Sequence, residues 1–399
     1  MSMTTMMRVR SWQGPALLSY GFRPFFLLAG IYAALLILLW VPWFLGLIAL
    51  PSALPPVAWH THELLFGFLP AVIAGFLLTA VPNWTGRLPV VGWPLGMLVA
   101  LWLLGRLAVS FSLMLHPAVV AAAAIAFPLA LGFVIGREIV AGRNWRNLKI
   151  LVILTLLIVA QVLFHIELWR TGAPTVSVRL AIAVAIMLIM IVGGRIIPSF
   201  TTNWLRQRGA RRLPAPFSNY DRAALIFSGM ALAGWVALSF IEASRPPIAG
   251  ALFIAGFANF WRQARWAPLR TFAEPLVAVL HLAYAFIGIG FLLAGLSAWL
   301  DDAGYGSAAI HAWTVGAIGT MTLAVMTRAT RGHTGRPLTA PAGTLAIYAA
   351  VTIAAAARIA AALRPEYTAA LLPLAGFAWC GAFLGFAALY GPMLTMPRR

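Results

Sequence analysis

The sequence predicts an all-α integral membrane protein, a polytopic bundle of about twelve transmembrane helices. Of its 399 residues, 62% are hydrophobic and 9% are charged, whereas ordinary soluble domains have about 45–50% and about 25%. The apolar residues are gathered in runs of about 20, the length with which a helix crosses the hydrocarbon core of a bilayer. These runs are apolar on all sides and do not alternate, so they predict helices and not the strands of a membrane barrel.

The candidate spans follow one another along the whole chain. They lie near 24–49, 59–81, 94–114, 118–140, 148–169, 178–198, 222–241, 248–263, 273–299, 309–328, 341–362 and 368–391. The first follows a basic segment, Met1 to Arg10, and has no small-residue cleavage site after it. We therefore expect a retained span and not a signal peptide, and we expect residues 1–399 to form a single integral membrane domain.

Basic residues are distributed unevenly between alternate connections. The rich set, which includes the C-terminus, consists of Arg87, Arg143, Arg146, Lys149, Arg206, Arg208, Arg211, Arg212, Arg262, Arg265, Arg270, Arg328, Arg331, Arg336, Arg398 and Arg399. The poor set holds Arg170, Arg179, Arg245 and Arg364, together with the acids Asp301 and Asp302. This asymmetry predicts that both termini are cytoplasmic. The net charge of +19 is then mainly a topology signal that contacts anionic membrane lipid, and no nucleic-acid partner is expected.

A weak internal similarity relates three span ends. The second span ends in AGFLLTAVPNWTGR, the sixth in GGRIIPSFTTNWLR and the tenth in MTRATRGHTGR. Their spacing of roughly 120 to 130 residues predicts three repeats of four helices, with bounds near 1–146, 147–270 and 271–399. The alternative is that cytoplasmic helix ends are commonly rich in Trp and Arg.

The histidines are the main candidates for chemistry, because intramembrane polar residues are costly and mark function by default. At about 1.5 Å per helical residue, the predicted topology places His60, His62, His165 and His311 in an outer zone, with His116 as a fifth candidate. Four imidazoles at one level suit copper or iron better than magnesium or calcium. The single Cys380 permits no thiolate cluster and no Cys-x-x-Cys-His haem attachment.

Local geometry limits the outer zone. In a regular helix His60 and His62 point about 200° apart, so both reach one metal only if the helix begins after His60; otherwise one of them, His62, is the ligand. Glu63 follows directly and is a candidate proton relay or a residue that orients His60. The alternative for Glu63 is a helix-start carboxylate favoured by the helix dipole.

A second, inner zone holds His281 and His333. His281 lies deep in the ninth span, where a haem-ligand role and a helix-to-helix hydrogen bond are equally good interpretations. Arg23, Arg195 and Arg328 could clamp anionic groups near the cytoplasmic face, such as haem propionates. For each arginine alone, snorkelling to lipid headgroups is the simpler interpretation.

Five motifs resemble the NnrS family of bacterial membrane proteins. They are GFRPFF (from Gly21), WHTHELLFGF (from Trp59), VPNWTGR (from Val81), the helix around His281 and HAWTVGAIGTMTLAVMTRATRGHTGRPL (from His311). The family's usual WHAHE has Thr61 in its middle place here, which leaves both histidines intact. The resemblance reaches from the first span to the tenth.

The resemblance implies a multi-pass inner-membrane protein that contains haem and copper and is produced in response to nitric oxide, in denitrification or nitrosative stress. Four outer histidines match the count for one axial ligand of a haem and three ligands of a copper. Such a pair would bind nitric oxide or reduce two molecules of it, with two electrons and two protons, to nitrous oxide and water. With one cysteine, the haem would be noncovalent haem b. An enzyme of this kind would be an oxidoreductase of the nitric oxide reductase type, with an electron donor still to be identified.

Two alternatives remain open. The first is a sensor or metal-handling protein that binds haem and copper without turnover, which fits the absence of a recognisable docking domain for an electron donor. The second is a twelve-helix transporter. Against transport, the apparent repeat is four helices three times and not six helices twice, and no pair of Gly- or Pro-broken spans stands out.

Overall fold

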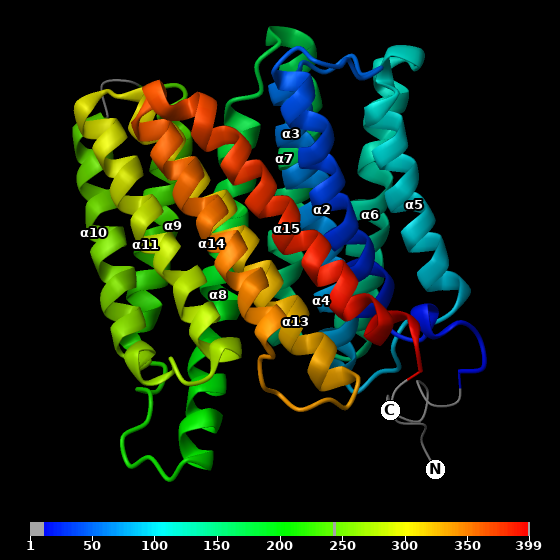
Figure 1. Cartoon of the computed structure of the whole chain (residues 1–399), viewed down its shortest axis with the longest axis vertical. Coiled ribbons are helices and arrows are strands. Elements are labelled where there is room, and N and C mark those ends of the chain that lie inside the picture. The colour runs from blue at the N-terminus through cyan, green and yellow to red at the C-terminus, as the bar shows by residue number, and fades with distance from the viewer. Residues whose placement is uncertain (1–11, 242–244, 398–399) are drawn as a thin grey trace. The chain divides into compact units, whose positions relative to one another are not determined.

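The computed structural model describes residues 12–241 and 245–397, and the basic segment at the N-terminus and the last two arginines lie outside this part (Figure 1). Its regular structure there is helical throughout. Ten helices are long and apolar enough to span a membrane: Phe22–Phe44, Pro56–Thr85, Trp93–Ser110, Pro117–Ala141, Trp145–Thr171, Val176–Gln207, Pro275–Leu300, Ala303–His333, Ala342–Leu363 and Pro365–Thr395. The prediction of a polytopic helical bundle is confirmed.

The other two predicted spans are also helices. They are α9 (Asn219–Ala237) and α10 (Arg245–Ala264), predicted near 222–241 and 248–263. Both are less apolar than the ten candidates, because each carries charged residues as well as buried polar ones such as Ser228 and Asn259.

The chain folds as two compact units. Unit 1 comprises Met1–Ala181, Ala329–Pro337 and Phe383–Arg399, and unit 2 comprises Ile182–Arg328 and Leu338–Ala382. The prediction of one domain with three repeats is not tested by this division and stays a prediction.

Within unit 1, the central helix runs from Pro56 to Thr85 as α3 (Pro56–His62), η2 (Glu63–Phe68) and α4 (Leu69–Thr85). Helix α4 packs against α2 (Phe22–Phe44) and α6 (Pro117–Ala141), and α6 also packs against α5 (Trp93–Ser110) and α7 (Leu148–Thr171). Small residues allow these close approaches: a Cβ on Gly105 of α5 would lie 3.0 Å from the Ala123 carbonyl of α6.

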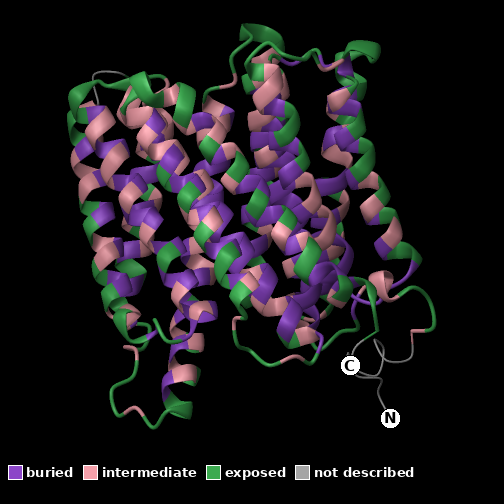
Figure 2. Ribbon diagram, in the orientation of Figure 1, coloured by how far each residue is buried: buried purple, intermediate pink, exposed green. Residues whose placement is uncertain are grey.

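Within unit 2, α10 packs against α9 and α11 (Pro275–Leu300). A second composite helix consists of α12 (Ala303–His311), η7 (Ala312–Gly319) and α13 (Thr320–His333), whose last residues, from Ala329, belong to unit 1. Helix α14 (Ala342–Leu363) packs against α12 and η7. Most residues of η2, α4 and η7 are buried, in contrast to the green, exposed residues that recur on α10 in Figure 2.

In both composite helices the backbone hydrogen-bond pattern changes from α to π directly after a histidine. The segments η2 and η7 are π-helical and begin at Glu63 and Ala312, next to His62 and His311. In η2 the Leu69 amide donates to the Leu64 carbonyl, five residues earlier. Because π turns inside α-helices are frequent at functional sites, both histidines mark places to examine.

Candidate functional site

Glu63 is the centre of a buried polar cluster in unit 1. Its carboxylate is fully buried and accepts hydrogen bonds from three side chains. Arg106 Nη1 donates to both carboxylate oxygens at 2.7 Å, and the Tyr32 hydroxyl donates to Oε2. His62 Nδ1 lies 2.8 Å from Oε1. The cluster holds the negative charge of Glu63 and the positive charge of Arg106, so its net charge is zero. A buried charge is tolerated when it is paired in this way.

Three elements bring this cluster together. Tyr32 comes from α2, Arg106 from α5, and Glu63 is the first residue of the π turn. Gly67, in the same turn, makes room for the guanidinium, because a Cβ there would lie 2.6 Å from Arg106 Nη1 and 3.0 Å from Glu63 Oε2. Trp102 of α5 closes the arrangement: its Nε1 donates to the Gly67 carbonyl at 2.9 Å, and its ring packs edge-on against Tyr32.

His62 and His165 face each other above this carboxylate. Their ring centroids are 5.1 Å apart, and Phe66 and Phe164 pack around His62. Both Nε2 atoms are buried, and neither has a hydrogen-bond partner within the described residues. A buried polar atom without a partner costs about 1–3 kcal/mol, so the two nitrogens are candidate ligand-binding atoms.

The carboxylate determines the tautomer of His62. Glu63 is held as an anion by Arg106, so it accepts the Nδ1 proton of a neutral imidazole and leaves a lone pair on Nε2. A ring whose second nitrogen donates to a carboxylate is the usual arrangement of a metal-binding histidine. Glu63 therefore orients His62 and not His60, the neighbour proposed from the sequence.

His60 occupies a different environment. Helix α3 begins at Pro56, so both histidines of the WHTHE motif are helical and the condition under which they share a metal is not met. The His60 ring stacks on Trp40 with centroids 4.0 Å apart. Of the two, His62 is the residue that faces His165.

A family model described as NnrS protein matches residues 16–398, nearly the whole chain. The chain belongs to the NnrS family. No curated protein matches it. Membership agrees with the resemblance carried by the histidine motifs, and ten apolar helices make this NnrS protein a multi-pass membrane protein.

The fourth outer histidine of the NnrS chain, His311, belongs to unit 2. Its Nδ1 donates to the Ser307 carbonyl at 2.7 Å, and its Nε2 accepts from Arg358 Nη2 at 2.7 Å. Both ring nitrogens are thus occupied by protein groups. Among the described residues, no group of three or more His, Cys, Asp or Glu side chains is placed to hold a metal.

His281 is a buried residue of α11 in unit 2, and its ring contacts α8 (Val176–Gln207). Thr201 donates to the Ile197 carbonyl and therefore accepts from His281 Nε2 at 2.9 Å. Gln263 donates to the His281 carbonyl at 2.6 Å. The remaining nitrogen, Nδ1, is buried and has no partner in the described part of the chain.

The other residues proposed from the sequence belong to both units. Arg23 donates to the carbonyls of Leu394 and Met396, and His333 packs edge-on against Tyr20. Both belong to unit 1, whereas Arg195 and Arg328 belong to unit 2.

Within unit 2, Arg195 is exposed and Arg328 lies over the ring of Phe200 at 4.1 Å. The fifth outer candidate, His116, is exposed and accepts from the Ala118 amide as the N-cap of α6.

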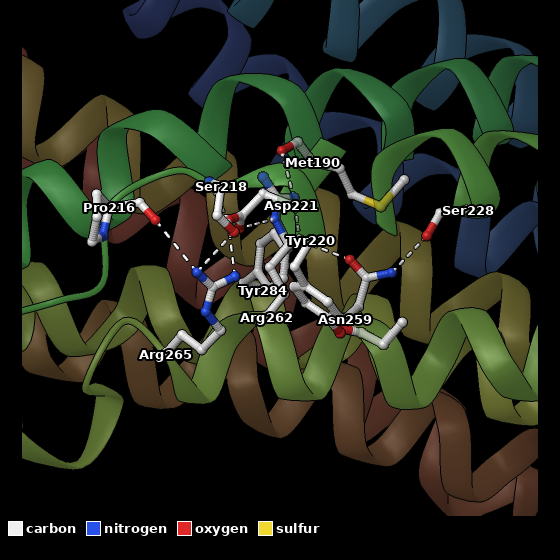
Figure 3. Close-up of polar contacts among 11 residues, drawn as sticks. Met190, Pro216, Ser218, Tyr220, Asp221, Ser228, Asn259, Arg262, Arg265 and Tyr284 are labelled. Carbon is white, nitrogen blue, oxygen red and sulfur yellow. Dashed lines mark hydrogen bonds and ion pairs between the residues drawn. The ribbon is translucent and has the colours of Figure 1, made fainter. Parts of the chain in front are cut away.

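A second ion cluster, shown in Figure 3, joins α9, α10 and α11 of unit 2. Asp221 Oδ1 accepts from Arg262 Nε at 3.1 Å and Oδ2 accepts from Arg265 Nη1 at 2.9 Å. Arg262, which sequence analysis assigned to a basic connection, is buried in α10 and also donates to the Tyr284 hydroxyl at 2.8 Å. Tyr284 in turn donates to Asn259 at 2.8 Å.

The electrostatics of this cluster favour the charged aspartate. Burial raises the pKa of the Asp221 carboxyl, but hydrogen bonds from Ser218 and the two arginines outweigh it and hold the pKa below its ordinary value. Every polar group drawn in the close-up finds a partner, as a cluster that fixes helix packing requires. Within it we identify no group left over for a ligand.

Two residues of the unit 1 site were missed from the sequence. Tyr32 lies in an apolar run and gives no signal of its own. The sequence does carry a signal for Arg106, because Glu63 and Arg106 lie at similar predicted depths in neighbouring spans. A buried carboxylate in a membrane requires a cation at its own level.

Proposed function

We propose that this NnrS-family protein is a nitric-oxide-response protein of the bacterial inner membrane that binds a copper ion at His62 and His165. The observation that carries the proposal is the pair of buried, unpartnered Nε2 atoms on facing rings. The predicted orientation, with both termini in the cytoplasm, places this pair near the outer leaflet. Nitric oxide is apolar and small, so it reaches such a site through the lipid.

The donor set fits copper. Imidazole nitrogen is a ligand that copper shares with zinc, iron and nickel. His62 is already held in the required tautomer by Glu63, and Glu63 is held by Arg106 and Tyr32. With the only cysteine, Cys380, elsewhere in the chain, thiolate does not compete. Copper is preferred to the other three metals because the family resemblance implies it.

A bound copper would supply a binding position for nitric oxide and a one-electron redox couple. The chain's own residues contribute the surroundings. Phe66 and Phe164 exclude water from the face of His62. Arg106 keeps Glu63 ionised, so the carboxylate holds the Nδ1 proton in place. The Tyr32 hydroxyl donates to the same carboxylate.

Haem b does not fit the described residues in the same way. The candidate axial ligand His281 uses Nε2 for Thr201, so only its remaining nitrogen, Nδ1, is left for a ligand. We therefore assign no step to haem, which stays a prediction of the family resemblance.

Binding of nitric oxide without turnover is the second candidate function. The observation in its favour is that Arg106 bonds both oxygens of Glu63. A carboxylate held this firmly is well suited to orient His62 and poorly suited to carry protons for a reduction. Binding and reduction share the same copper ligands and differ in whether nitrous oxide is formed.

Metal analysis of the purified full-length protein tests the proposal. We expect about one copper per chain, with nitrogen couplings from imidazole in the electron paramagnetic resonance spectrum of the oxidised protein. His62→Gln and His165→Gln should each lower copper affinity by more than the about 10–100-fold that the loss of an outer-shell partner costs. His116→Gln is the matched control, because His116 is an exposed helix cap.

Two outcomes contradict the proposal. Copper retained at full occupancy in both His62→Gln and His165→Gln would place the metal elsewhere. Loss of copper in His311→Gln, with retention in His165→Gln, would favour a site that includes His311. Nitrous oxide release from nitric oxide and a chemical reductant then decides between reduction and binding. A protein that binds neither copper nor nitric oxide would support the transporter alternative.

A further inference from the structure

The two composite helices share a few sequence positions and one local structural feature. Aligned without a gap, His62 matches His311, Gly67 matches Gly316, and Thr85-Gly86-Arg87 matches Thr334-Gly335-Arg336. In both helices the π turn begins at the residue after the histidine. Each glycine admits a neighbouring side chain: Gly67 admits the Arg106 guanidinium, and at Gly316 a Cβ would lie 2.5 Å from the ring of Phe286.

Each composite helix also contacts an arginine from the next helix of the chain. In unit 1 this is Arg106 of α5, and in unit 2 it is Arg358 of α14. Arg106 reaches His62 through Glu63, whereas Arg358 Nη2 contacts His311 directly at 2.7 Å.

The two helices differ at the position directly after the histidine, where unit 1 has the carboxylate of Glu63 and unit 2 has Ala312. Arg358 consequently has no carboxylate partner among the described residues, although it lies within the candidate span Ala342–Leu363. The acids at the start of α12 are already engaged, since Asp301 pairs with Arg245 and Asp302 caps the Gly304 amide.

A guanidinium inside a membrane span is costly without an anion. The neutral His311 accepts one N–H of Arg358 and supplies no charge. The other N–H groups of the guanidinium form a fork that matches a carboxylate-shaped anion bidentately. In unit 1 the chain itself supplies that anion as Glu63.

We propose that unit 2 carries a second site, at Arg358 and His311, that binds a small bent monoanion with two terminal oxygens. The anion would occupy the place that the Glu63 carboxylate holds in unit 1. Formate and nitrite are the simplest members of this chemical class. The site is separate from the copper ligands His62 and His165, so it stands or falls independently of the proposed function.

Binding of isotope-labelled formate to the full-length protein in nanodiscs of zwitterionic lipid tests this assignment. The carboxylate stretch in difference infrared spectra reports a formate bound to a guanidinium. We expect saturable binding at one site per chain. Arg358→Gln should weaken it about tenfold or more, the effect of losing a charge-assisted hydrogen bond. Nitrite should displace formate.

Two further variants sharpen the test. Ala312→Glu restores the unit 1 pattern and should abolish formate binding, because its own carboxylate then pairs with Arg358. Arg364→Gln is the matched control, since Arg364 is exposed at the end of the same helix and should leave binding unchanged.

Three results overturn the proposal. The first is formate binding that survives both Arg358→Gln and Ala312→Glu. The second is chloride that displaces formate at equal concentration, which indicates a halide site. The third is binding of anionic lipid at Arg358 that excludes formate, which makes the arginine a headgroup anchor. Ala312→Glu keeps the test decisive if Arg358→Gln does not fold.

Discussion

Removing the guanidinium of Arg106 should destabilise the protein more than any other single change at the unit 1 site. In Arg106→Gln the fully buried Glu63 must remain charged without a partner or take up a proton. Breaking a buried ion pair costs about 3–5 kcal/mol. Protonation sets an upper limit, because neutralising a glutamate of ordinary pKa about 4.3 at pH 7 costs about 3.7 kcal/mol.

We therefore expect Arg106→Gln to lose about 3–4 kcal/mol at pH 7, more than a hundredfold in the unfolding equilibrium. The variant's folded state binds a proton that the unfolded chain does not, so the loss should shrink by about 1.4 kcal/mol for each pH unit towards pH 5. Titration of the full-length protein from mild detergent into sodium dodecyl sulfate, followed by tryptophan fluorescence, gives the free energy of unfolding.

Two comparisons make the result decisive. The double variant Glu63→Gln/Arg106→Gln should be much less destabilised than the sum of the single variants, because it leaves no unpaired charge. Arg137→Gln is the control: Arg137 is 55% exposed, and its partner Glu138 keeps a second arginine, Arg87, so the loss of Arg137 should cost about 1 kcal/mol or less. A loss below about 1 kcal/mol for Arg106→Gln, or one that does not change with pH, would refute the assignment of a buried ion pair.

The remaining predictions use the same unfolding titration. Tyr32→Phe removes one donor to Glu63 and should cost about 1 kcal/mol. Gly67→Ala forces a methyl group against Arg106 and should cost about 1–3 kcal/mol, whereas Gly250→Ala, with nothing within 4 Å of its Cβ, should be neutral or stabilise by about 0.5–1 kcal/mol. For Asp221, the lowered pKa of the folded state contributes stability above the ordinary carboxyl pKa of about 3.9, and this is lost as pH falls through the folded value. Stability should thus fall less steeply below about pH 4 in Asp221→Asn; equal slopes would contradict this.

Apolar run length was sufficient to locate the spans. The predicted span 59–81 lies inside Pro56–Thr85, and 273–299 nearly coincides with Pro275–Leu300. These segments must satisfy their own backbone hydrogen bonds in lipid, so length and composition leave little choice of structure. Depth along the helices placed His60, His62, His165 and His311 at one level, and of these His62 and His165 lie next to each other in the structure.

Side-chain partners could not be predicted from the same information. Whether His60 or His62 faces inward depends on where helix α3 begins, and Pro56 as its first residue settled this only in the structure. The partner of Arg358 depends on how α14 is rotated against α12. Hydropathy does not determine that rotation, because both helices are apolar on nearly all sides.

The π turns have a consequence for how the composite helices can change. In an α-helix each residue advances the chain by about 100°, so a π turn, which accommodates one extra residue, sets the two halves out of phase by about that angle. The face that the helix presents to its neighbours before the π turn, at His62, is therefore set apart from the face that α4 presents after it. Deleting one residue from Glu63–Phe68 would cancel the offset and turn His62 away from His165 while leaving every helix of the protein intact.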